Sequence, residues 1–192
     1  MEMNKNFGIN REEAMELLNK HIKNPNMLKH CYASEAVMRA LAKRLDEDEE
    51  KWALAGLLHD LDVETVKADL SVHGLKTVEI LTGKGVDPEI IDAIKMHNEE
   101  AHGKKRNTRF QHALAGGETI TGLIVATALV YPDKKLASVK VKSIVKGMQE
   151  KHLARSVDRD IILECEKVGI ELNEFCQLAL NAMQEIADVL GL

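Results

Sequence analysis

The sequence predicts an all-α protein, a helical bundle with additional helices at its C-terminal end. Only three of its 192 residues are proline, and Ala, Leu, Lys and Glu, which favour helices, are abundant. Aromatic residues make up 3% of the chain and hydrophobic residues 45%, so the core must be built from aliphatic side chains and methionine. No segment has a convincing strand pattern, since the apolar alternation from Val139 to Ser143 is short.

The expected helices follow one another without a linker rich in Ser, Gly or Pro. Asn10 can cap the first helix, which has glutamates in its first turn and runs to about His21. A second helix is expected at about 27–45, where apolar residues recur at helical spacing. The third helix begins near the acidic residues 46–50 and ends at His59.

The later helices are marked by glycine and proline. Residues 71–81 predict a short helix that Gly83 and Gly85 terminate. Asp87 followed by Pro88 is typical of a helix start, with an N-cap and then a proline in the first turn. Further helices are expected at residues 112–132, 138–150, 158–168 and 173–190.

We expect these helices to form a single domain over residues 1–192, with a core at about 25–135 and a C-terminal helical extension at 136–192. The last helix has an apolar face at helical spacing. This face could pack on the core or on a second chain, so a homodimer remains open.

Charge and cysteine content limit the class of protein. The net charge is −5, which argues against a dedicated nucleic-acid-binding protein. The three cysteines lack a CxxC spacing, so we interpret them as reduced thiols in a cytoplasmic protein. There is no apolar signal-peptide region near the N-terminus, and the longest apolar stretch, ITGLIVATALVY, is too short to span a bilayer. We therefore expect no membrane partner.

Several ionisable residues lie on apolar helix faces. The third helix, ALAGLLHDLDVE, ends in the pair His59–Asp60. His30, His97 and Glu118 each share a stripe with aliphatic residues of their own helix. Burying any one of these groups without a partner is costly, but a shared cation would stabilise them together.

The ligand types indicate which cation. Neutral imidazoles and carboxylates suit divalent iron, manganese, cobalt, nickel or zinc, and the lack of thiolates argues against a structural zinc site. Each residue alone has a simpler explanation, as a hydrogen-bonded core histidine or a buried ion pair. The combination on four separate helices favours a metal centre. The other histidines are expected to be exposed: His21, His102, His112 and His152.

The order His30, His59–Asp60 and a late acid resembles the HD-domain superfamily of metal-dependent phosphohydrolases. The surrounding segments LKHCYASEAVMRALA, LAGLLHDLD, VHGLKTVEIL and IKMHN are also similar, and the likeness covers about 25–135. The segment PDKKLASVKVKSIVKGM resembles the tail of an uncharacterised bacterial and archaeal subgroup. The resemblance implies a five-helix core in which His30, His59, Asp60 and Glu118 hold a metal.

Two departures from the family pattern stand out. The family's last ligand is usually Asp, whereas this chain has Glu118, and Leu61–Asp62 stands where many members have Ile-Gly. Members with two metals have extra histidines, and His73 and His97 occupy similar places here. Asp60 would then bridge two ions, and we favour two metals over one.

The reaction implied is hydrolysis of a phosphate ester or anhydride, with a nucleotide as the expected small-molecule substrate. Asp60 is the expected catalytic residue, because one carboxylate oxygen can ligate while the other orients water. Substrate phosphate could contact the basic loop between His97 and Glu118, which contains Lys104, Lys105, Arg106 and Arg109. A second basic cluster contains Lys140, Lys142 and Lys146, and both clusters could instead be solvated surface charge.

Two other functions remain open. One is a catalytically weak regulatory domain that binds a nucleotide or metal without turnover, which the departures at Asp62 and Glu118 motivate. The other is a structural helical protein whose buried polar groups pair with one another. Asp62 and Glu64 could also lie near the metal, as groups that support its ligands or donate a proton.

Overall fold

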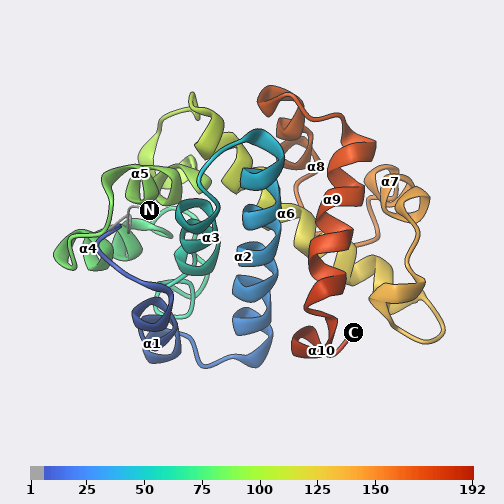
Figure 1. Ribbon diagram of the computed structural model, residues 1–192, viewed down its shortest axis with the longest axis horizontal. Helices are drawn as coiled ribbons and strands as arrows, with labels where there is room; N and C mark the ends of the chain where they lie inside the picture. Colours follow the sequence, from blue (N-terminus) through green and yellow to red (C-terminus); the bar gives the residue numbers. More distant parts are fainter. Residues whose placement is uncertain (1–6) are drawn as a thin grey trace, which may run out of the picture.

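The computed structural model describes residues 7–192, in which all regular structure is helical and no strand occurs (Figure 1). The all-α prediction is therefore confirmed. The α-helices are α1 Arg11–His21, α2 Pro25–Leu45, α3 Glu49–Leu58, α4 Leu75–Gly83, α5 Pro88–His97, α6 Arg109–Val130, α7 Val141–Gln149, α8 Arg159–Ile162, α9 Leu172–Glu185 and α10 Ala187–Leu190. Three short 3-10 helices are η1 Glu100–His102, η2 Leu136–Ser138 and η3 Leu163–Val168.

Side-chain caps begin most of the helices that surround the site. Asn10 and Glu13 form a capping box at the start of α1, and Asp87 caps α5 ahead of Pro88, both as expected. Helix α6 begins three residues before the expected 112, because Thr108 and Gln111 form a second capping box. The caps satisfy backbone N–H groups that would otherwise lack partners.

Three expected elements differ in the structure. The helix expected at 71–81 begins only at Leu75, because Gly74 has a φ of +94° and residues 71–74 form turns. The segment 158–168 divides into α8 and η3, and the last helix is interrupted at Ile186 between α9 and α10. Hydrophobic spacing is similar in such continuous and divided helices, so it cannot reveal the breaks.

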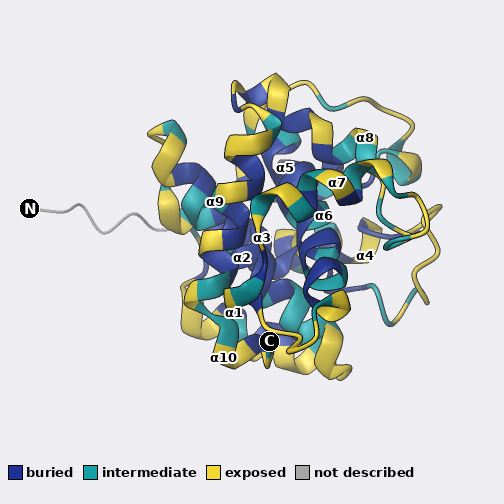
Figure 2. Ribbon diagram, turned by 90° about the vertical axis from the view of Figure 1, so that its right-hand side faces the viewer, coloured by how far each residue is buried: buried dark blue, intermediate teal, exposed yellow. Residues whose placement is uncertain are grey.

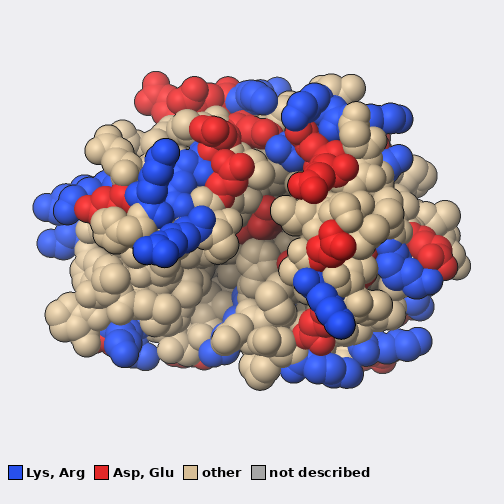
Figure 3. All heavy atoms as spheres, turned by 180° about the vertical axis from the view of Figure 1, so that it is seen from behind, with Lys and Arg blue, Asp and Glu red and all other residues tan. Residues whose placement is uncertain are grey.

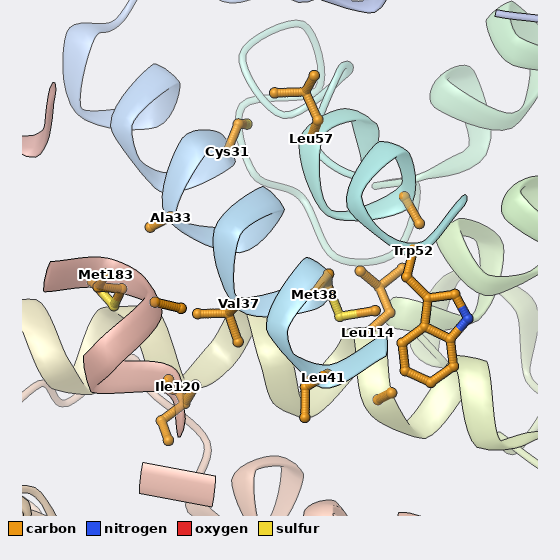
Figure 4. Packing of buried hydrophobic residues seen from close by; sticks show 14 of the residues in the cluster. Cys31, Ala33, Val37, Met38, Leu41, Trp52, Leu57, Leu114, Ile120 and Met183 are labelled. Carbon is orange, nitrogen blue, oxygen red and sulfur yellow. The ribbon is translucent and has the colours of Figure 1, made fainter. Parts of the chain in front are cut away.

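Helix α2 runs through the middle of the bundle and packs against α3, α6 and α9 (Figure 1). The inner faces of these helices are buried and their outer faces are exposed (Figure 2). Aliphatic side chains fill the contact, with Met38 and Leu41 of α2 close to Leu114 of α6 (Figure 4). Trp52 stacks on Phe110 with ring centroids 4.9 Å apart. The three cysteines are buried free thiols.

Helices α2 and α3 approach each other closely at Gly56. A Cβ atom at this position would lie 2.5 Å from the carbonyl oxygen of Ser34. Glycine is therefore required here, because a side chain would collide with the backbone of α2. This contact fixes the end of α3 relative to α2, and the functional residues described below lie at that end.

Helix α6 is longer than the apolar stretch that the sequence suggested. It has 22 residues, and its most apolar 18-residue window has a mean hydropathy of 1.6, so length and composition alone would allow it to cross a membrane. However, 67% of its most apolar window is buried within the protein. The other helices of the bundle cover most of it, while Leu129 and Val130 at its C-terminal end are exposed.

Candidate metal centre

Six ligand-type side chains from five parts of the chain lie close together. His30 is in α2, His59 and Asp60 follow α3, and His97 is the last residue of α5. Glu118 is in the middle of α6, and His73 lies in the turn before α4 rather than in a helix. The structure thus brings together all six residues that the sequence suggested as metal ligands.

The first group consists of His30, His59 and Asp60. The Nε2 atoms of His30 and His59 are 3.1 Å apart, and Oδ2 of Asp60 is 3.6 Å from His30 Nε2. Each residue offers a ligand atom within 4.8 Å of the other two. Glu118 lies beside this group, with Oε2 3.7 Å from His30 Nε2, but the three-residue set does not include it.

The second group consists of Asp60, His73 and His97. Oδ1 of Asp60 is 3.0 Å from Nε2 of His73 and 3.6 Å from Nε2 of His97, and the two Nε2 atoms are 3.0 Å apart. Asp60 therefore belongs to both groups: its Oδ2 lies near His30, while its Oδ1 lies near His73 and His97 and is also 3.3 Å from Nε2 of His59. A carboxylate in this position can contact an ion in either group.

Hydrogen bonds at Nδ1 orient the imidazole rings. Nδ1 of His59 donates to the carbonyl of Gly56 at 2.8 Å, and Nδ1 of His97 donates to the carbonyl of Ile94 at 2.5 Å. Since a carbonyl only accepts, the proton of each neutral ring is on Nδ1, and the lone pair on Nε2 points into the cluster.

His30 is oriented in the same way through a hydroxyl group. The Thr121 hydroxyl donates to the backbone carbonyl of Glu118, so its oxygen accepts the proton of His30 Nδ1 at 3.0 Å. The Nε2 lone pairs of His30 and His59 then face each other at 3.1 Å. This contact is unfavourable unless a cation lies between the two nitrogens.

The spacing fits a divalent metal. Two ligands that are each about 2.1 Å from one ion lie roughly 3.0–3.4 Å apart in octahedral or tetrahedral coordination. The shortest separations in the two groups, 3.0 and 3.1 Å, match this range. Three imidazoles or carboxylates per group, with no thiolate, suit iron, manganese, cobalt, nickel or zinc. The described residues therefore fit one ion per group.

Burial and neighbouring charges set the protonation of the cluster. Burial lowers the pKa of His59 to about 3, so the ring is neutral. Burial would raise the pKa of Asp60, but the surrounding histidines outweigh it and hold that pKa well below its ordinary value. Burial, with a smaller contribution from the charge of Asp60, raises the pKa of Glu118, although His30 and Thr119 act in the opposite direction. A cation in the first group would offset the cost of keeping both carboxylates charged.

His73 lies between two carboxylates. Its burial would lower its pKa, but hydrogen bonds to Asp60 and Asp62 raise it to about 10. The ring is therefore an imidazolium that donates one hydrogen bond from Nε2 to Asp60 and another from Nδ1 to Asp62. A metal in the second group would take the place of the Nε2 proton.

Asp62 is fully buried and supports the second group. Besides His73, its carboxylate accepts hydrogen bonds from the backbone N–H groups of Gly74, Lys76 and Thr77 at 2.9–3.1 Å. It does not line the cavity, so it cannot donate a proton to a substrate there. Glu64 is also directed elsewhere, since it accepts from the backbone N–H groups of Lys23 and Asn24.

A cavity of about 790 Å³ opens onto the cluster and is lined by His30, Asp60, His73, His97 and Glu118. The expected basic loop contributes only Lys105 and Arg106 to its wall, and Lys104 and Arg109 do not line it. Arg109 forms an exposed ion pair with Glu47. Lys105 pairs with Glu99. The loop therefore does not present four cations to a substrate.

Arg106 has a structural role that the sequence did not indicate. Its side chain is 5% exposed and makes a bidentate ion pair with Glu164 at 2.8 and 2.9 Å. It also donates to the carbonyls of Met96 and His97 at the end of α5, which fixes the helix end that holds His97.

His112 and Glu164 complete this ion-pair network. His112 was expected to be exposed, but its side chain is 11% exposed and its Nδ1 lies 2.7 Å from Glu164. Glu164 lies three residues after Ile161 and four before Val168, so a polar residue on an apolar stripe could have signalled its burial. Burial would raise the pKa of Glu164, but Arg106 and His112 lower it.

A second cavity, of about 950 Å³, lies between α2 and α9 and contains none of the six ligand-type residues. It is larger, and its wall combines partly buried apolar side chains, such as Met15 and Leu178, with charged side chains that pair with one another, such as Arg11 and Glu35. The convergence of buried ligands makes the smaller cavity the better candidate for a functional site.

The model of the HD domain family matches residues 27–168. This match extends beyond the expected core at 25–135 and into the C-terminal helices, as far as the end of η3. No curated protein and no solved structure gave a match.

Proposed function

The chain belongs to the HD domain family, and we propose that it is a phosphohydrolase that depends on a divalent transition metal. The observation that carries the proposal is the position of Asp60, which belongs to both ligand groups and lines the cavity that opens onto them. We propose that His30, His59, Asp60 and Glu118 hold one ion and that Asp60, His73 and His97 hold a second.

Bound divalent ions would lower the pKa of water and offset the negative charge of a phosphoryl group. The protein fixes the positions of the side chains that would hold these ions. The Nδ1 hydrogen bonds of His30, His59 and His97 keep their Nε2 atoms directed inward. Asp62 orients the ring of His73 through its Nδ1 atom. Preorganisation of this kind avoids rearrangement during the reaction.

The reaction we propose is attack of water on phosphorus with cleavage of the bond to the leaving group, which departs with a proton. The substrate would be a phosphate ester or anhydride whose phosphate lies over Asp60. Asp60 can orient the attacking water through hydrogen bonding. The resemblance suggests a nucleotide, so nucleotides belong in the first set of compounds to test.

The test is phosphate release from a panel of nucleotides, dinucleoside polyphosphates and simple monoesters, with iron, manganese, cobalt or nickel added separately. We expect turnover of at least one class by the loaded protein and none by Asp60→Ala. No release from any compound with any of these metals would overturn the proposal, provided elemental analysis shows that the wild type is loaded.

A regulatory domain that binds phosphate compounds without turnover is the second candidate. It is favoured by the engagement of Lys105 and Arg106 in ion pairs, which leaves neither cation of the cavity wall free to assist catalysis. Binding of a nucleotide by the metal-loaded protein without any hydrolysis would select this function.

A further inference from the structure

The wall of the metal-site cavity is strongly acidic. Seven Asp and Glu residues of the described chain line it, against one Lys and one Arg. The face opposite to that of Figure 1 is hollowed near its centre, and acidic side chains lie around and within this hollow (Figure 3). Such a wall is unusual for a site that would bind phosphate. Which partner each charged side chain has therefore bears on what the cavity can bind.

Four of the seven carboxylates already have partners. Asp60 and Glu118 face the histidines of the ligand groups, where bound cations would offset them. Glu99 pairs with Lys105 and Arg106, and Glu164 pairs with Arg106. Lys105 and Arg106, the two cationic side chains of the wall, are therefore both engaged in ion pairs.

Three carboxylates remain, on Glu100, Asp158 and Asp160. All three are exposed and line the cavity, and none has an ion pair with another described residue. They come from two segments of the chain, Glu100 in η1 after α5 and Asp158 and Asp160 at the start of α8. They share the cavity wall with Asp60, so a substrate whose phosphate lies over Asp60 would have these carboxylates in the same cavity.

Their charge disfavours a second or third phosphate. A polyphosphate would bring further negative charge beside uncompensated carboxylates, with no free Lys or Arg on the described wall to bind it. A positively charged group on the substrate would instead gain favourable interactions with the same carboxylates.

The wall also lacks the usual means of binding a nucleobase. No Phe, Tyr or Trp is among the described residues that line the cavity. Stacking on aromatic rings is a common way to hold a base. The amide of Asn98 is occupied by the carbonyls of Leu70 and His73. Most of the uncharged wall is aliphatic, formed by residues such as Met27, Val63 and Ile161, and Thr119 and Ser156 add two hydroxyl groups.

We infer that the cavity selects a phosphate monoester of a small aliphatic amino alcohol, with the phosphate at the metal groups and the ammonium group among Glu100, Asp158 and Asp160. This inference rests on the proposed phosphohydrolase function and narrows its substrate class. Nucleotides and polyphosphates are then poorer substrates. The acidic residues determine specificity within the cavity and do not form a separate site.

The experiment compares matched pairs of compounds that differ by one ammonium group. Hydrolysis of 3-aminopropyl phosphate and of propyl phosphate by the manganese-loaded protein is measured in parallel assays. ATP is assayed beside them as a representative polyphosphate. We expect kcat/KM for the amino compound to exceed that of propyl phosphate at least tenfold, and that of ATP by more. Calorimetry with 3-aminopropylphosphonate and propylphosphonate measures the same preference by binding alone.

The variant that tests the carboxylates is Glu100→Gln/Asp158→Asn/Asp160→Asn. Asn is a good N-cap, so it keeps the hydrogen bond from the N–H of Asp160 that Asp158 accepts at the start of α8. The matched control, Glu12→Gln/Glu166→Gln/Glu171→Gln, removes the same number of exposed carboxylates outside the cavity. We expect the preference for the amino compound to fall to about one in the first variant and to stay unchanged in the control.

The outcomes separate this inference from the proposed function. The inference would be overturned if the wild type had equal kcat/KM for the two phosphates and equal affinity for the two phosphonates, or if ATP were the best substrate. Hydrolysis of any compound in either case would still support the proposed phosphohydrolase function. No turnover of any compound would overturn the phosphohydrolase function. Even then, tighter binding of the aminophosphonate than of propylphosphonate would support selection of an ammonium group, provided the triple variant loses this preference and the control keeps it.

Discussion

Oδ1 of Asp62 lies 2.8 Å from Nδ1 of His73, and the same buried carboxylate accepts three backbone N–H groups from the start of α4. The residue that departs from the common family pattern therefore joins the turn after the His–Asp pair to a candidate ligand. It orients His73 and simultaneously satisfies the first turn of a helix that has no side-chain cap of its own.

The first prediction concerns Asp62→Asn. An amide cannot accept as many hydrogen bonds and no longer holds the charge that orients His73, so we expect affinity for the second ion to fall about 10–100-fold. Metal titration followed by calorimetry measures this. Asp62→Ala should also destabilise the fold, by about 3 kcal/mol, because buried N–H groups lose their acceptor. Unchanged affinity for both ions in Asp62→Asn would contradict the role assigned to this residue.

The second prediction concerns the sharing of Asp60. Asp60→Ala should lose both ions, whereas His30→Ala should lose the ion of the first group and His97→Ala that of the second. Elemental analysis of the purified proteins measures the number of ions per chain, and far-UV circular dichroism checks that the helices are retained. Full metal content in Asp60→Ala would show that the two groups do not depend on the shared carboxylate.

The third prediction concerns metal removal. An ion that binds only the folded state stabilises it by mass action, so chelation should lower the melting temperature of the wild type. Asp60→Ala, which has no ion to lose, should melt at the same temperature with and without the chelator. Identical melting of the wild type under both conditions would favour a structural role for the buried polar groups.

The fourth prediction concerns the close contact of α2 and α3. Gly56→Ala would place a methyl group 2.5 Å from the carbonyl oxygen of Ser34, so we expect destabilisation of about 3 kcal/mol in urea unfolding. Gly83→Ala is the control, because nothing lies within 4 Å of its added Cβ and alanine favours the helix. If both variants were equally stable, the helices could separate at Gly56 without cost.

The fifth prediction concerns pH and Glu164. Arg106 and His112 outweigh burial and lower the pKa of Glu164 below its ordinary value of 4.5, so the ionised carboxylate stabilises the folded state. This stabilisation is complete well above pH 4.5 and is lost as the pH falls through the lowered pKa. Glu164→Gln should therefore cost about 3 kcal/mol at pH 7, and the difference from the wild type should shrink below pH 4.5.

Urea unfolding of both proteins between pH 3 and 7 measures this difference. A matched control is Glu166→Gln, since Glu166 is exposed and close in sequence. A difference between wild type and Glu164→Gln that stays constant across this pH range would show that the ion pair with Arg106 does not depend on the charge of Glu164.

The sequence by itself determined the all-α class, most helix boundaries and the ligand-type residues that lie on apolar helix faces, while the family resemblance added His73. These are local properties. Helical spacing places His30, His97 and Glu118 on apolar faces, and capping residues such as Asn10 and Asp87 act on the next turn of their own chain. The cost of burying an unpaired ionisable group then points to convergence without any knowledge of the tertiary structure.

Only the tertiary structure decided how those residues are grouped and what the remaining charges do. Asp60 is shared between two groups because α2, α5 and the turn before α4 meet at the end of α3. Arg106, expected to bind phosphate, is bound instead to Glu164, 58 residues away. Such pairings depend on long-range packing, and charge along the sequence does not reveal which partner a buried side chain will have.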